Sequence, residues 1–211
     1  MKNGIIPTLV ALAIALPTTA VFAQNQAGQK PSTVVSLGEL KNQLASLQGM
    51  ISSTVASLER VKSAGDDGSL GKASSDFTTR LKGLDNQVEL IRRYAVTVKA
   101  RAKDHYEIWQ KEISTVQNPK IREKAQERFA EARKQLDKII STAGETKQQL
   151  GPFLTDLKDI GIYLEADTSQ DAVKSLSNTI WKLGNKSKTV IGSISDLNEQ
   201  IDRAIQATPK T

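Results

Sequence analysis

The sequence predicts an all-α protein: an elongated antiparallel bundle of about four long helices with coiled-coil character. Apolar residues recur at alternating steps of three and four through most of the 211 residues, a spacing that places them along one seam of a helix. Short turns rich in Gly, Ser, Asn, Asp and Pro separate these seams, and such turns make neighbouring helices antiparallel. The chain has no cysteine, so packing alone must hold the fold.

Residues 1–23 have the pattern of a signal peptide. Lys2 supplies a basic start, Ile5–Leu16 is an apolar run, and Pro17 breaks this run before a Val21-Phe22-Ala23 end. The apolar run is shorter than the roughly 20 residues that a spanning helix needs, and no cysteine is present for lipid attachment. We therefore expect a periplasmic protein, cleaved after Ala23, with neither a transmembrane helix nor a lipid anchor. The expected organisation is a signal peptide over 1–23, a flexible leader over 24–32, a single helical-bundle domain over 33–207 and a frayed tail over 208–211.

The first helix is expected to begin near Ser32 or Thr33 and to end before the turn Ser63–Ser69, which is rich in Gly and Asp. Either Thr54 or Val55 fills the one seam position that lacks a large apolar residue. The other seam residues are Leu37, Leu40, Leu44, Leu47, Ile51, Leu58 and Val61.

The second helix carries the most regular seam, and the rest of the bundle is expected to lie along it. It should begin after Ser74 or Ser75, because serine is a favoured N-cap residue. After Ala102 the spacing slips, and either His105 or Tyr106 must take the next seam position. The remaining seam residues are Phe77, Leu81, Leu84, Val88, Ile91, Ala95, Val98, Trp109 and Ile113.

Asn118-Pro119 stops the second helix and starts the third, since proline suits the first helical turn. Gly144 and Pro152 predict a kink or break within the third helix. The fourth helix should open at Thr168 or Ser169. The third seam is Ala125, Phe129, Ala132, Leu136, Ile139, Ala143, Leu150, Leu154 and Leu157, and the fourth is Leu176, Ile180, Leu183, Ser187, Val190, Ile194, Leu197, Ile201 and Ala204.

A group of residues in the second half of the chain forms a recognisable pattern. It comprises Trp109 with Glu112, Asn118 with Arg122, Pro152, Leu154, Asp159, Tyr163-Leu164, and Ala172 with Leu176. Over residues 109–176 the chain resembles a family of bacterial envelope proteins named only as domain of unknown function 2959 (DUF2959). The resemblance implies an exported, mostly helical protein and no known activity. The chain departs from the family in lacking the lipoprotein cysteine of many members, and in having Glu165-Ala166-Asp167 where members have a more basic turn.

The sequence shows no catalytic or metal-binding constellation. His105 is the only histidine, and Ala102 stands where a Glu-x-x-His metal motif needs its carboxylate. The acids of Glu165–Asp171 are spaced like the start of a calcium loop, but Gln170 replaces the required glycine and Leu176 the bidentate carboxylate. We interpret these acids as helix caps. No catalytic residue, metal site or cofactor is predicted, and an enzyme is not expected.

The formal net charge is +6, and cationic residues gather in two segments. Each segment suits a surface of anionic phospholipid headgroups, which attract lysine and arginine. The candidate residues for binding an anionic surface are Arg92, Arg93, Lys99, Arg101 and Lys103 in the second helix, and Lys174, Lys182, Lys186 and Lys188 in the fourth.

Both segments also have alternative interpretations. Tyr94, Tyr106, Trp109 and Trp181 share these helices with the cations, as in an interfacial surface, but aromatic residues on a bundle are more often part of its core. The lysines of the fourth helix have an internal alternative, because two of them could face acids across an antiparallel pair. These pairs would join Lys182 and Lys186 to Asp156 and Asp159.

The leading hypothesis is a non-enzymatic periplasmic scaffold or adaptor that binds a membrane surface, or an envelope protein, through a basic helical face. BAR-type membrane-shaping modules are an architectural analogy only, and the analogy requires a homodimer, which the sequence leaves open. Nucleic acid is not an expected partner outside the cytoplasm. The alternative is a periplasmic chaperone or protein-binding module that opens near Gly144–Pro152 and presents apolar seam residues. A third hypothesis, a ligand or metal carrier at Glu165–Asp171, is the most remote.

Overall fold

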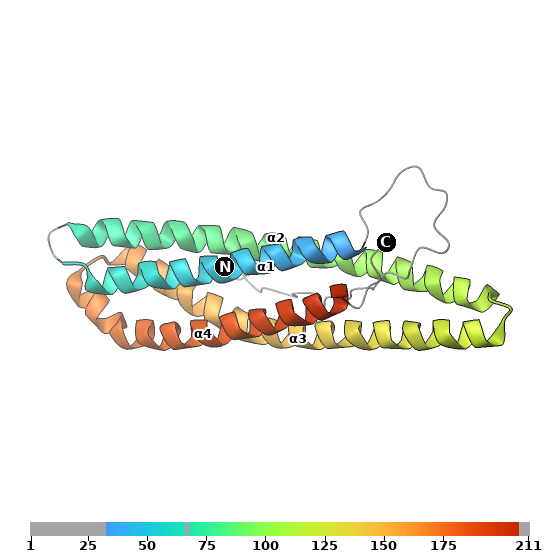
Figure 1. The fold of residues 1–211 in the computed structure, drawn as a ribbon. Helices are drawn as coiled ribbons and strands as arrows, with labels where there is room; N and C mark the ends of the chain where they lie inside the picture. Colours follow the sequence, from blue (N-terminus) through green and yellow to red (C-terminus); the bar gives the residue numbers. More distant parts are fainter. Residues whose placement is uncertain (1–32, 66–67, 207–211) are drawn as a thin grey trace, which may run out of the picture. The chain divides into compact units, whose positions relative to one another are not determined.

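The computed structural model describes residues 33–65 and 68–206, and over these residues the chain forms four helices and no strand (Figure 1). These are α1 (Thr33–Ser63), α2 (Ser69–Thr115), α3 (Pro119–Ala166) and α4 (Gln170–Gln206). The predicted all-α helical bundle is confirmed. The expected signal peptide, leader and C-terminal tail lie outside the described residues, and the single domain over 33–207 stays a prediction.

The described residues fall into two compact units, and every helix contributes a segment to both. The first unit contains Gln43–Leu90 and Glu145–Ser195. The second unit contains Ile91–Gly144 together with residues 33–42 and 196–206.

In the first unit the four helical segments run antiparallel to their neighbours. For each neighbouring pair, residue numbers rise along one helix as they fall along the other, which is the arrangement that short turns impose. The contacts that establish this order are Arg60 with Asp76 and Gln43 with Gln87 for α1 and α2, Leu81 with Gly161 and Asp85 with Lys158 for α2 and α3, Asp156 with Lys186 and Tyr163 with Ser175 for α3 and α4, and Gln48 with Ser195 and Glu59 with Gly184 for α4 and α1.

The predicted seams form the buried core. On α2 the seam residues from Phe77 to Ala102 are all buried, and Thr54 rather than Val55 fills the open position on α1, with no exposed surface. The α3 and α4 seams are also buried, except that Ala125, Phe129 and Leu176 are only half-buried. Three large apolar residues of α3 were not assigned to the seam but are buried: Phe153, Ile160 and Leu164.

In the second unit, α2 and α3 form a hairpin to which α1 and α4 add short segments. The Tyr94 hydroxyl of α2 donates to the Glu39 carboxylate of α1, and Lys41 of α1 lies 2.6 Å from Asp202 of α4. Figure 1 shows that the hairpin continues past the described ends of α1 and α4. Near the turn between α2 and α3, two helices therefore pack without the other two, among the described residues.

The predicted start of α2 is wrong. The helix begins at Ser69, before the predicted serines, because Leu70 is buried and extends the seam to one turn before Ser74 and two turns before Phe77. Gly68 has a φ of 81°, a left-handed conformation that glycine adopts at no steric cost, and it brings the chain into the helix.

The break predicted in α3 as one alternative is wrong, because α3 is continuous from Pro119 to Ala166 with Pro152 inside it, and the other alternative, a kink, stays a prediction. Proline removes one helical hydrogen bond, to the carbonyl four residues earlier. Both Pro152 and Gln148, whose carbonyl loses its partner, are exposed, so water can replace the missing donor.

The two remaining helix starts agree with their predicted caps. The Asn118 side-chain oxygen accepts N–H bonds from Lys120 and Ile121 at 3.1 and 3.3 Å, directly before α3. At α4 the Ser169 hydroxyl accepts the N–H of Ala172 at 3.2 Å. Asp167 accepts the N–H of Ser169 at 2.9 Å, and this bond and one to the Ser169 side chain lower the pKa of Asp167. The capping interpretation of this acidic turn is confirmed for Asp167.

Candidate functional site

The exposed side of α4 in the first unit is strongly basic. We call it the α4 basic face, and it consists of Lys174, Trp181, Lys182, Lys186 and Lys188, all exposed. No Asp or Glu occurs between Ala172 and Ser195. Buried residues such as Ile180, Leu183 and Val190 occupy the opposite side of the same helix, so packing against the core fixes the direction of the cations.

Two of the four lysines are paired and two are free of ion pairs within the described residues. Lys174 lies 3.2 Å from Asp171, in the first turn of α4. Lys186 forms an ion pair with Asp156 of α3, as the internal alternative predicted. The pair predicted between Lys182 and Asp159 does not occur. Lys182 and Lys188 are therefore the most available cations of the face.

Within the α4 basic face, three residues lie along one line. Lys174, Trp181 and Lys188 are seven residues apart, which is about two helical turns, so they share one side of α4. Trp181 is 61% exposed although it is one of only two tryptophans in the chain. The face thus combines a large aromatic ring with cations before and after it.

The basic segment of α2 lies in the second unit and does not form a comparable face. Arg92 and Arg101 are nine residues apart, or about half a rotation at roughly 100° per residue, and each is half-buried on its own side of α2. Lys103 lies 3.9 Å from Glu107. Only Arg93 and Lys99 are exposed and without an ion pair in the described part of the chain. Arg92, Lys99 and Lys103 thus fall on one side of α2, but Arg92 is half-buried and Lys103 is paired, while Arg93 and Arg101 lie on other sides.

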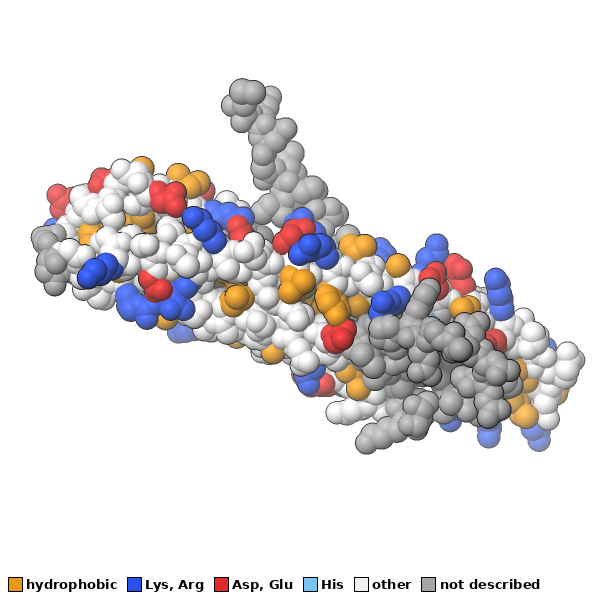
Figure 2. Space-filling view, turned by 90° about the horizontal axis from the view of Figure 1, so that it is seen from above, with side chains coloured by type: hydrophobic (Ala, Val, Ile, Leu, Met, Phe, Trp, Pro, Cys, Tyr) orange, Lys and Arg blue, Asp and Glu red, His pale blue; other side chains and the backbone are white. Residues whose placement is uncertain are grey.

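Charges of both signs are interspersed on the face of the molecule shown in Figure 2, where hydrophobic side chains form small separate groups.

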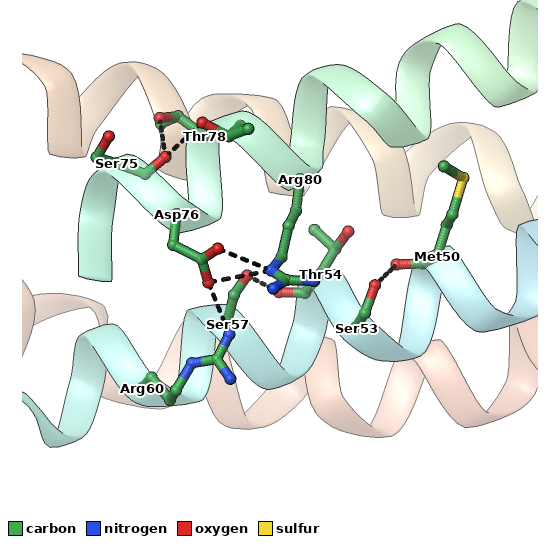
Figure 3. Close-up of polar contacts among 10 residues, drawn as sticks. Met50, Ser53, Thr54, Ser57, Arg60, Ser75, Asp76, Thr78 and Arg80 are labelled. Atoms are coloured by element: carbon green, nitrogen blue, oxygen red, sulfur yellow. Dashed lines mark hydrogen bonds and ion pairs between the residues drawn. The ribbon is translucent and has the colours of Figure 1, made fainter. Parts of the chain in front are cut away.

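One charged cluster, formed by Asp76, Arg80 and Arg60, has a clear structural role. Asp76 of α2 accepts hydrogen bonds from Arg80 on its own helix at 3.0 Å and from Arg60 of α1 at 2.7 Å (Figure 3). The bond to Arg80, followed by that to Arg60, holds the pKa of Asp76 below its ordinary value. This cluster ties α1 to α2.

The second unit contains an aromatic cluster between α2 and α3. Phe129 of α3 meets Trp109 and Tyr106 of α2 edge to face, with ring centroids 5.1 and 5.4 Å apart. His105 and Tyr106 are both half-buried, so they share the seam position at which the spacing slips. Beside the cluster is a hollow of about 320 Å³, lined by Lys103, Tyr106, Glu107, Gln110, Phe129, Arg133, Leu136, Asp137 and Ile140.

The residues that the structure describes contain neither a candidate metal centre nor a membrane-spanning helix. Among them, no group of three or more His, Asp or Glu side chains could hold a metal ion. No helix of the described chain has the length and apolar character required to cross a membrane.

Comparison with protein families identifies the family of this chain. The model of a family described as a protein of unknown function (DUF2959) matches residues 33–208. The chain belongs to the DUF2959 family. Comparisons with curated proteins and with solved structures gave no match. The DUF2959 match spans all four helices, so it extends well beyond residues 109–176, on which the sequence resemblance rested.

Sequence reasoning on this DUF2959 protein found the lysines of α4 but did not include Trp181 among the candidate site residues. The available signal was the seven-residue spacing of Trp181 from Lys174 and Lys188. Two exposed isoleucines near the α2–α3 turn, Ile108 and Ile121, were not recognised either, and they are 55% and 58% exposed. Ile121 falls four residues before Ala125, the first predicted seam position of α3, so the spacing predicted burial and gave no signal of its exposure.

Proposed function

We propose that this DUF2959 protein is a non-enzymatic periplasmic scaffold or adaptor that binds an anionic surface of the envelope through the α4 basic face. The observation that carries the proposal is the run from Ala172 to Ser195, which has four exposed lysines and no acid on a helix whose other side is buried. The signal-peptide pattern of residues 1–23 supports the periplasmic location.

The expected strength of binding follows from the charges. Each lysine near an anionic membrane surface contributes about 1 kcal/mol. Lys182 and Lys188 would together contribute about 2 kcal/mol, or roughly thirtyfold in affinity. Lys174 and Lys186 should each add less, because Asp171 and Asp156 already pair with them. Attraction of this kind is reversible and is screened by salt, with a Debye length of about 10 Å at 0.1 M.

Co-sedimentation with vesicles tests the proposal. The protein, purified after expression of the full chain, is mixed with neutral or anionic vesicles over a range of salt concentrations. Binding is expected only with anionic vesicles and should weaken as salt increases. The triple variant Lys174→Gln, Lys182→Gln and Lys188→Gln should lose most of this binding.

The matched control removes the same number of charges from α3. Lys120→Gln, Lys124→Gln and Lys138→Gln change three exposed lysines of the second unit, and this variant should bind almost as well as the native protein. Equal losses in the two triple variants would mean that net charge, not the α4 basic face, determines binding. If the protein binds no vesicle under any condition, the proposal is wrong and a protein partner becomes the alternative.

The α2 basic segment provides a second comparison. Charge reversal at Arg92, Arg93, Lys99 and Arg101 removes more positive charge than the α4 triple variant, yet it should reduce binding less, because Arg92 and Arg101 are half-buried and lie on opposite sides of α2. Complete loss of vesicle binding with unchanged helicity would instead assign the surface to α2.

Ile108 and Ile121 support a second candidate function, that of a protein-binding module. Each is more than half exposed near the turn of the α2–α3 hairpin. A client bound through these side chains would be held by apolar contact, which salt does not weaken. The salt dependence of binding therefore separates this function from the first.

A further inference from the structure

We infer that the partner of the α4 basic face is a lipid bilayer and that Trp181 anchors the protein by entering the boundary between headgroups and acyl chains. This inference rests on the proposed function and specifies its ligand. It goes beyond charge attraction because it assigns the central contact to an uncharged side chain.

The exposure of Trp181 is the first reason. Its side chain is 61% exposed, while the only other tryptophan, Trp109, is 5% exposed inside the aromatic cluster of the second unit. Tryptophan has a large apolar surface, whose exposure to water is unfavourable. A single exposed apolar residue is common on proteins, so exposure alone would not define a site.

The surroundings of Trp181 are the second reason. On its line along α4, Lys174 and Lys188 lie roughly 10 Å away on either side, at about 1.5 Å per residue. About one turn before and after the ring, the exposed positions on this side are neutral, namely Asn178 and Asn185. No acidic or larger side chain of α4 on this line would hold the ring away from a flat surface.

The charges bordering this line are also accounted for. On the α1 side, the Glu59 carboxylate lies close to Gly184, and the Lys62 ammonium lies 3.8 Å from that carboxylate. On the α3 side, Asp156 is paired with Lys186. These two acids are thus each matched by a lysine, whereas Asp159 of α3 is exposed and forms no ion pair within the described residues. The two unpaired lysines, Lys182 and Lys188, outnumber this one acid.

A bilayer fits this combination better than a soluble polyanion does. Tryptophan concentrates at the membrane–water interface, where its ring is buried and its N–H remains near water. Interfacial helices have lysines on their polar sides that contact anionic headgroups. A soluble polyanion would be held by the lysines alone and would leave Trp181 exposed.

Tryptophan fluorescence tests the inference directly because the chain has two tryptophans. In the variant Trp109→Phe, all tryptophan emission comes from Trp181. Adding vesicles of phosphatidylglycerol and phosphatidylcholine should shift this emission to shorter wavelength, and lipids brominated on their acyl chains should quench it. Trp181→Phe in the otherwise native chain keeps only the buried Trp109, and its emission should show neither effect.

Trp109 is buried in the second unit, so Trp109→Phe could disturb the fold. A second measurement that keeps Trp109 is therefore needed. The difference between native emission and Trp181→Phe emission isolates the same signal without altering Trp109. Trp181→Ala should weaken vesicle binding about tenfold, whereas Ile162→Ala should leave it unchanged. Ile162 is the matched control, since it is 67% exposed and lies on α3 of the first unit.

The outcomes distinguish this inference from the proposed function. If anionic vesicles bind but the lipids do not quench Trp181, and Trp181→Ala binds normally, the anchor is wrong while the α4 basic face stands. If polyphosphate or heparin produces the same emission shift, the partner is a soluble polyanion and the inference fails. If no vesicle binds under any condition, both proposals fail.

Discussion

The two units of the bundle have cores of different composition. The first unit is filled by large aliphatic side chains and phenylalanine, whereas the second contains many alanines and one aromatic cluster. Of the eleven largest fully buried side chains, eight belong to the first unit: Leu47, Ile51, Leu58, Phe77, Leu84, Phe153, Leu157 and Leu164. The other three are Leu37, Leu40 and Ile139.

This difference shows that one continuous seam pattern can produce two kinds of packing. Spacing in the sequence determines which side of each helix is buried, but the sizes of the side chains determine how much apolar area is removed from water. In the first unit, stabilisation is spread over all four helices. In the second, the aliphatic contacts are supplemented by those of Phe129 with Trp109 and Tyr106.

The largest expected effect comes from placing a charge in the first core. Leu84 has no exposed surface, so Leu84→Asp buries an unpaired carboxylate and should destabilise the protein by about 4 kcal/mol or more. Thermal unfolding followed by circular dichroism measures the loss. Lys82→Asp changes an exposed position of the same helix and should melt close to the native protein. Native melting of Leu84→Asp would refute the assigned core.

Removing the central ring of the aromatic cluster should have a smaller and more local effect. Phe129→Ala is expected to cost about 2 kcal/mol, because Phe129 is only half-buried. Hydrogen exchange should become faster in the α2–α3 hairpin of the second unit, and Phe129→Leu should recover part of the loss. Equal acceleration among the amides of Gln43–Leu90 would mean that the two cores do not differ in this way.

Glycine substitutions on α3 should have opposite signs in the two units. A Cβ at Gly161 would lie 3.0 Å from Cδ2 of the buried Leu81, whereas one at Gly144 would have no neighbour within 4 Å. Alanine favours a helix over glycine by about 1 kcal/mol, but overpacking costs about 1 to 3 kcal/mol. Gly161→Ala should therefore destabilise by about 1 kcal/mol and Gly144→Ala should stabilise by a similar amount, as measured by denaturant midpoints. Stabilisation by both would show that Leu81 moves aside freely.

The smallest effect is the pH dependence from Asp76. Since its folded-state pKa lies below its ordinary value of 3.8, its ion pairs stabilise the fold above that pH, and the contribution disappears as the pH falls through the folded pKa. Asp76→Asn should thus lower the melting temperature at neutral pH, and the difference should shrink as the pH falls below 3.8 and vanish once it is below the folded pKa. Asp104→Asn removes an exposed carboxylate of the second unit as a control. A difference between native protein and Asp76→Asn that persists in strong acid would assign the effect to something other than charge.

The sequence was sufficient to predict the helices and most of their buried sides. The steps of three and four placed the α2 seam correctly, from Phe77 to Ala102, because this spacing alone determines the side of a helix. The start of α2 was mispredicted because several serines could cap it, and only the burial of Leu70 distinguishes them. Pro152 does not break α3, because it lies on the exposed side of the helix. The prediction of a break did not take this position into account.

The candidate site was predictable in composition but not in geometry. The pairing of Lys186 with Asp156 follows from the antiparallel register, yet the equally plausible pairing of Lys182 with Asp159 does not form, since register alone does not fix how far each helix is rotated. The dispersal of Arg92 and Arg101 around α2 could have been derived from their nine-residue separation. The exposure of Trp181 could not, because aromatic residues occur both in cores and at surfaces.

The contribution of every helix to both units has a consequence for the order of folding. Gln48 reaches Ser195 across 147 residues of chain in the first unit, and Lys41 reaches Asp202 across 161 residues in the second. Contacts so distant along the chain close large loops and form late. Neither unit can therefore be completed before α4 has been synthesised. The helix that carries the basic face also closes both cores. A nascent chain that ends before Gln170 lacks this helix, so its α2 and α3 are incompletely packed and should be accessible to the quality-control proteases of the cell.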